Sequence, residues 1–186
     1  MKKSTIVLIV IIIIAGLAVS YFSKKEGWVV NHPVADQPTH TVPIVDPKNG
    51  TYTIDNQSIT LANGKAELET EPGSASKDIF AMFGEPVIGD INGDGVKDAV
   101  FILSEQTGGT ATFFYAVASV SSGDSFVGTN GIILGDRIAP QNIRIDNAMI
   151  EVNYADRKAG EPMSEQPSLG VTKNVQFKGG ILIEVK

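Results

Sequence analysis

The fold of this chain is decided by residues 89–103, which read Gly-Asp-Ile-Asn-Gly-Asp-Gly-Val-Lys-Asp-Ala-Val-Phe-Ile-Leu. In the first part, acidic and amide side chains alternate with other residues, and the glycines are typical of a tightly turned loop. The second part, residues 99–103, is an apolar run typical of a buried strand. A loop that leads directly into such a strand predicts β-structure here and not a helix.

The loop carries three carboxylates and one amide within nine residues, and these groups would repel one another unless a cation collected them. A hard divalent cation takes about six to eight oxygen ligands, which alternate side chains of a turned loop can supply. The spacing fits the calcium pattern D-x-[DN]-x-[DN]-G, with a backbone carbonyl at the seventh position and a further ligand at the ninth. The sequence therefore predicts a Ca²⁺ site. Its expected ligands are Asp90, Asn92, Asp94, Val96 and Asp98.

An EF-hand is rejected because its twelfth position, a bidentate Glu, is Phe101 here, and because a strand follows the loop. The loop instead resembles the calcium loop of FG-GAP and VCBS repeats, found in integrin-type β-propeller blades. This resemblance implies that the four side chains and the Val96 carbonyl ligate the ion. A propeller repeats its blade every 40–50 residues or so, whereas this motif occurs once, so the propeller architecture is not implied.

Two alternatives stay open for the loop. An Asp/Asn/Gly-rich run can be a metal-free turn, because these residues tolerate left-handed backbone and accept hydrogen bonds from nearby backbone amides. A bound ion could also be structural or regulatory. The adjacent core strand favours a structural ion.

From residue 51 onward, short period-two segments broken by Gly, Asn and Asp predict an all-β domain over residues 51–186. The expected architecture is a sandwich, barrel or curled antiparallel sheet of about eight to ten strands. Residues 110–120 should form the longest strand, in a central position, because both faces are apolar. Residues 79–83 fit a strand or a short helical turn, and Asn63-Gly64 and Gly179-Gly180 predict hairpin turns. Segments 127–130, 134–141, 152–157 and 160–163 are similar to small exported bacterial all-β proteins of unassigned function.

The N-terminus predicts a single-pass membrane protein. Lys2 and Lys3 precede an uncharged apolar run over residues 5–22, which as a helix would be about 27 Å long. Residues 1–22 are therefore expected to form a transmembrane signal anchor, although the Ala18-x-Ser20 pattern leaves a cleaved signal peptide open. Residues 23–50, with four prolines, should form a tether. The C-terminal domain is then extracytoplasmic, either periplasmic or extracellular, and without cysteine it has no disulfides.

The composition excludes several classes of function. The net charge of −6 argues against nucleic-acid binding. The chain has no cysteine, and its only histidines, His32 and His40, lie in the tether, so the domain cannot build a Ser-His-Asp triad. We expect no enzyme, but a membrane-tethered calcium-binding module that serves as a binding or cell-envelope domain, with an envelope glycan or protein as partner.

Two other functional classes stay open. One is a hydrolase of envelope glycans that uses carboxylates such as Asp156 and Glu161. The other is a purely structural domain. The matching dipeptides Asp136-Arg137 and Asp156-Arg157 fit a polar site shared by two loops, but they favour an ion pair or hydrogen-bond network that ties loops to the sheet.

Overall fold

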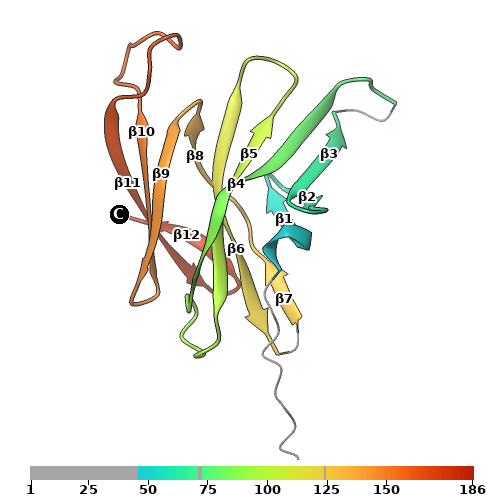
Figure 1. Cartoon of the computed structure of the whole chain (residues 1–186), viewed down its shortest axis with the longest axis vertical. Coiled ribbons are helices and arrows are strands. Elements are labelled where there is room, and N and C mark those ends of the chain that lie inside the picture. Colours follow the sequence, from blue (N-terminus) through green and yellow to red (C-terminus); the bar gives the residue numbers. More distant parts are fainter. Residues whose placement is uncertain (1–45, 71–72, 124) are drawn as a thin grey trace, which may run out of the picture. The chain divides into compact units, whose positions relative to one another are not determined.

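The computed structural model describes residues 46–70, 73–123 and 125–186, and this part of the chain is an all-β domain of antiparallel sheets (Figure 1). The predicted transmembrane anchor and most of the predicted tether lie outside the described residues. Within the described ranges, no helix has the length and apolar character needed to cross a bilayer.

The described residues form twelve strands and one short 3-10 helix, η1 (Pro47–Asn49). The strands are β1 (Thr51–Ile54), β2 (Gln57–Thr60), β3 (Lys65–Glu69), β4 (Lys77–Gly89), β5 (Asp98–Gln106), β6 (Thr112–Ser122), β7 (Ser125–Gly128), β8 (Ile132–Asp136), β9 (Ala139–Asp146), β10 (Met149–Asp156), β11 (Leu169–Lys178) and β12 (Ile181–Val185).

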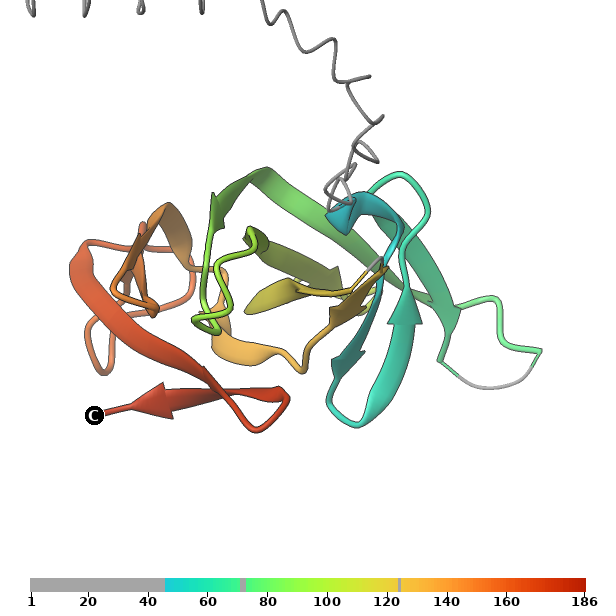
Figure 2. The same cartoon turned by 90° about the horizontal axis from the view of Figure 1, so that it is seen from below.

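These strands form three sheets. A six-stranded sheet has the order β3-β4-β5-β6-β7, with β8 also pairing with β6. A four-stranded sheet has the order β12-β11-β10-β9, and β1 and β2 form a separate hairpin. Figures 1 and 2 show the four-stranded sheet (orange to red) and the β1–β2 hairpin (cyan) on opposite sides of the six-stranded sheet. The architecture is a sandwich whose central sheet is covered on both faces.

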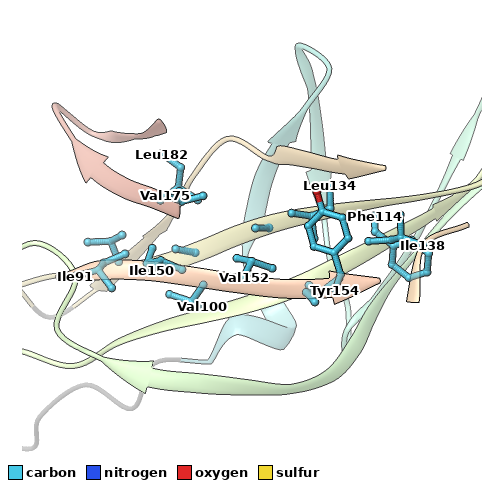
Figure 3. Close-up of a cluster of buried hydrophobic side chains, with 14 residues drawn as sticks. Ile91, Val100, Phe114, Leu134, Ile138, Ile150, Val152, Tyr154, Val175 and Leu182 are labelled. Atoms are coloured by element: carbon cyan, nitrogen blue, oxygen red, sulfur yellow. The ribbon is translucent and has the colours of Figure 1, made fainter. Parts of the chain in front are cut away.

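The larger core lies between the six-stranded and four-stranded sheets (Figure 3). Alternate residues of β5 and β6 face it, as expected from the period-two geometry of a strand. Its buried members are Ile91, Val100, Ile102, Phe114, Ala116, Ala118, Val120, Leu134, Ile138, Ile150, Val152, Tyr154, Val175 and Leu182.

The second core lies under the β1–β2 hairpin, on the other face of the six-stranded sheet. Its buried members are Tyr52, Ile54, Ile59, Leu61, Phe80, Phe101, Leu103, Tyr115 and Val117. The Tyr52 and Phe101 rings pack edge to face with their centroids 5.1 Å apart. Because β5 and β6 contribute side chains to both cores, they carry apolar residues on both faces.

The predicted all-β, antiparallel character is confirmed, with four differences. The described residues form twelve strands, whereas about eight to ten were expected. The longest strand is β4, which absorbs residues 79–83 and continues through an irregularity between Phe83 and Val87, so β6 is central but not longest. The turn at Asn63-Gly64 is present, with positive φ at both residues, but it joins two sheets, because β2 pairs with β1 and β3 pairs with β4. The short strand β7 has no counterpart in the sequence prediction.

The last residues assigned to the tether, 46–50, lie against the domain. The carbonyl of Pro47 accepts a hydrogen bond from the Tyr52 hydroxyl at 2.8 Å, and the carbonyl of Gly50 accepts one from the Leu61 amide at 2.9 Å. Residues 46–50 thus pack against the domain predicted for residues 51–186.

Candidate metal centre

The acidic loop, residues 90–97, connects β4 to β5 at the lower end of the six-stranded sheet in Figure 1. Gly89 and Asp98, which flank it, pair directly with each other across the two strands. Ile91 fixes the loop to the larger core, because its side chain is only 1% exposed. The loop therefore starts and ends at fixed points and has an apolar anchor near its first residue.

Asp98 is the buried member of the predicted ligand set, with 0% of its surface exposed. Its Oδ2 accepts a hydrogen bond from the Ile91 amide at 2.9 Å, and its Oδ1 accepts one from the Ser121 amide at 2.8 Å. Burial raises the pKa of the Asp98 carboxyl, the two N–H groups oppose this rise, and the charges of Asp94 and Asp90 add to it. Asp98 forms no salt bridge with any described residue.

Asp90 organises the first half of the loop. Its Oδ1 accepts hydrogen bonds from the amides of Asn92 and Gly93, at 3.2 and 2.7 Å, and its Oδ2 accepts one from the amide of Gly95 at 2.9 Å. The N–H groups of Gly95 and Gly93 lower the pKa of the Asp90 carboxyl, so it is held as the anion. Gly93 and Gly95 have φ of 81° and 82°, a conformation that glycine adopts without strain.

Asn92 and Asp94 form the exposed tip of the loop. The Asn92 Oδ1 accepts a hydrogen bond from the Asp94 amide, and the Asp94 Oδ1 accepts one from the Val96 amide at 2.7 Å. The side chains also bind each other, because the Asn92 amide nitrogen donates to the Asp94 Oδ2 at 2.9 Å. Val96, the expected carbonyl ligand, is half-buried.

One observation on this loop argues against a Ca²⁺ site, and several argue in favour of it. The described part of the chain gathers no group of three His, Cys, Asp or Glu side chains in a metal-holding arrangement, so the carboxylates of Asp90, Asp94 and Asp98 are neighbours without forming a preformed ion site. The donor set is nevertheless all oxygen, which suits a hard cation. The loop carboxylate oxygens that accept one N–H keep a second lone pair, whereas the Asp90 Oδ1 already accepts two. Asn92 and Asp94 are exposed, so their mutual hydrogen bond can be exchanged for ion contacts at small cost.

Two cavities flank the loop. One, of about 460 Å³, is lined by Asn92 and Asp94 on the loop, by Thr129 and by Phe177 of β11. The other, of about 480 Å³, is lined by Asp90 and Lys97 together with the β9–β10 turn. Both volumes lie within the range of small-molecule sites.

The sequence did not reveal the partners of the loop in the rest of the chain. The Ser121 amide, 23 residues after Asp98, binds the Asp98 carboxylate, and the Ser121 hydroxyl donates to the Lys97 carbonyl at 2.7 Å. No local pattern marks Ser121. It meets the loop because β6 runs antiparallel beside β5.

The two Asp-Arg dipeptides form the polar network that their sequence predicts. Arg137 pairs with Asp136 at 2.8 Å, and the Asp136 carboxylate also accepts a hydrogen bond from the Thr112 amide. Arg157 donates to the carbonyls of Arg137 and Glu165, at 2.9 and 2.7 Å. The network joins β8 to the β10–β11 loop.

Comparison with known proteins adds no family to this geometry: no protein-family model, curated protein or solved structure matches the chain.

Proposed function

We propose that this protein is a membrane-tethered, extracytoplasmic calcium-binding module in which one structural ion fastens the loop 90–97 to the central sheet. The observation that carries the proposal is the buried Asp98 carboxylate. It lies among the negative charges of Asp90 and Asp94 and is joined to two backbone amides. A cation held by the loop would offset this repulsion and the cost of burial.

The five expected ligands would hold the ion from different positions in the loop. Asp98 would supply an oxygen at the base of the site, and Asp90, Asn92 and Asp94 would close over the ion from the loop. The Val96 carbonyl would complete the protein ligands. The ion would take over a stapling role, because the chain has no cysteine and so no disulfide.

The binding role is proposed for the cavities beside the loop. Asn92 and Asp94 line one of them, so ordering of the loop by Ca²⁺ would also set the shape of that cavity. An envelope glycan or protein remains the proposed partner. No specific observation favours a hydrolase at Asp156 and Glu161, because these carboxylates accept hydrogen bonds from the amides of Arg157 and Lys158.

Thermal melting in Ca²⁺ and in chelator tests the proposal, with the Asp94→Asn variant as the decisive comparison. This variant keeps the oxygen that accepts the Val96 amide but loses the charge. Ca²⁺ at 100-fold its Kd should stabilise the wild type by about 2.7 kcal/mol, which raises the Tm by several degrees. Asp94→Asn should lose most of this shift, while Glu165→Gln, an exposed carboxylate outside the loop, should keep it.

A wild-type melting temperature that millimolar Ca²⁺ leaves unchanged would refute the ion site. The loop would then be the metal-free turn that its hydrogen bonds already allow.

A further inference from the structure

A second acidic cluster lies at the other end of β5, away from the calcium loop. The Tyr115 hydroxyl is 2.8 Å from the Glu105 Oε2 and 3.0 Å from the Asp55 Oδ2. Glu105 lies on β5, Tyr115 on β6, and Asp55 in the turn of the β1–β2 hairpin. Three separate elements thus meet at one hydroxyl group.

When both carboxyls are ionised, this arrangement has one proton fewer than its two hydrogen bonds need. A phenol has one O–H donor, and an ionised carboxylate only accepts hydrogen bonds. Tyr115 can therefore donate a hydrogen bond to one carboxylate. The oxygen of the other carboxylate would then face the lone pairs of the Tyr115 hydroxyl oxygen. Both contacts are hydrogen bonds only if one carboxyl carries a proton and donates it to the Tyr115 oxygen.

The surroundings place that proton on Glu105. Burial raises the pKa of Glu105, the Tyr115 hydrogen bond opposes the rise, and the negative charges of Asp78 on β4 and Asp55 in the turn increase it. Burial also raises the pKa of Tyr115, so its hydroxyl remains protonated. Asp78 is itself incompletely hydrogen-bonded, because its Oδ1 is buried and has no hydrogen-bond partner among the described residues. Among the described residues, the charged groups that act on Glu105 are Asp78 and Asp55, and both are acidic.

We propose that a proton shared along Glu105, Tyr115 and Asp55 latches the β1–β2 hairpin onto the six-stranded sheet, and that the latch closes in mildly acidic solution and loosens when this proton leaves. In the closed state Glu105 donates to the Tyr115 oxygen, and Tyr115 donates to Asp55. Loss of the proton breaks the first bond and leaves two carboxylates facing one hydroxyl. Loss of the proton therefore loosens the β1–β2 hairpin, which covers the core around Tyr52 and Phe101.

The direction of the pH effect follows from linkage. The folded protein holds the Glu105 proton to a higher pH than the unfolded chain does, so stability falls as pH rises. The contribution of the latch is complete below the ordinary carboxyl pKa of about 4.3 and is lost as pH rises through the raised pKa of Glu105. Within this window, protection of the hairpin should change roughly ten-fold per pH unit.

Amide hydrogen exchange of the full-length chain in detergent micelles, followed by mass spectrometry of peptides from residues 51–60, tests the latch. Rates at pH 4.5, 6.0 and 7.5 are corrected for intrinsic exchange. The wild type should lose protection as pH rises. Glu105→Gln, whose amide donates without titrating, should be protected at every pH. Tyr115→Phe should show the low protection of the open state throughout. Glu151→Gln on β10 makes the same chemical change in the other sheet and should follow the wild type.

Equal pH dependence in the wild type and Glu105→Gln would overturn the proposal, and so would a wild type whose protection does not vary with pH. A second measurement does not depend on the variants folding. The ¹³C signal of the Glu105 carboxyl should titrate above the ordinary glutamate range, and titration at or below that range would also overturn the latch.

Discussion

Asp98 is a buried acid whose two carboxylate oxygens each accept a backbone N–H, from Ile91 and from Ser121. These bonds close the acidic loop at its base and join β5 to the end of β6. Because both bonds come from backbone amides of the sheet and the loop, Asp98 contributes to the fold as well as to the proposed site.

Replacement of Asp98 with Ala should destabilise the domain even in chelator. Two buried N–H donors would lose their partners, which costs about 2–4 kcal/mol in total. Urea unfolding followed by circular dichroism measures this change. Asp146→Ala removes an exposed carboxylate that binds only the neighbouring Asn147 side chain, and it should change stability by less than about 0.5 kcal/mol. Equal stabilities of the two variants would show that the Asp98 bonds contribute little.

The sequence located the residues of the acidic loop but not their partners elsewhere in the chain, and Ca²⁺ binding stays a prediction. The spacing of Asp90, Asn92 and Asp94 is a local pattern, and the structure keeps these residues together in one turned loop. The burial of Asp98 was not visible, because it depends on Ser121, which lies next to the loop only once β5 and β6 pair. The Glu105–Tyr115–Asp55 cluster was missed for the same reason, since Asp55 and Tyr115 are 60 residues apart.

At the scale of elements, the strands were more predictable than their partners. The alternation in residues 52–54 and 58–61 marks both strands of the first hairpin, and the Asn63-Gly64 turn forms with hydrogen bonds between Ala62 and Lys65. The pairing of the strand after this turn was not predictable, because β3 leaves the hairpin to pair with β4. The choice of partner is set by packing over the second core, which a local pattern does not contain.

Gly128, at the end of β7, lies where the β1 strand of the hairpin packs closely against the six-stranded sheet. A Cβ there would overlap the Thr51 carbonyl oxygen and lie 2.8 Å from the Tyr52 Cδ1. Gly128→Ala should therefore push β1 away from β7 and destabilise the domain by about 2–4 kcal/mol, measured as a lower Tm. Gly170→Ala on β11 is the matched control, because its Cβ would meet no atom within 4 Å. Similar melting temperatures for the two variants would contradict this account of the contact.

At the scale of the whole molecule, the central sheet has a core on each face, the larger one under the four-stranded sheet and the smaller one under the hairpin. The apolar faces of residues 110–120 predicted a central strand, but the sequence left open whether the sheets form a sandwich, a barrel or a curled sheet. Which of these three architectures forms depends on where β9–β12 pack. These strands contact the central sheet mainly through side chains that are far apart in the sequence.

The membrane anchor is a prediction for the whole chain that rests on residues 1–22 alone. The full-length protein should stay with membranes after carbonate washing, and a chain that begins at residue 23 should be released, because the apolar run would be gone. Intact mass separates the two alternatives for this segment. A mature protein that starts at Tyr21 would show cleavage and refute the anchor.

The two acids of β5 have a consequence for how the strand finds its place during folding. Asp98 shares a face with Val100 and Ile102, which enter the larger core, whereas Glu105 shares a face with Leu103, which enters the smaller one. A slip by two residues in one direction would put Asp98 where Val100 belongs, and a slip in the other direction would put Glu105 where Leu103 belongs. Either error would carry a carboxyl group into an apolar core at a cost of several kcal/mol. The two acids thus select the correct register of β5 against a two-residue slip in either direction.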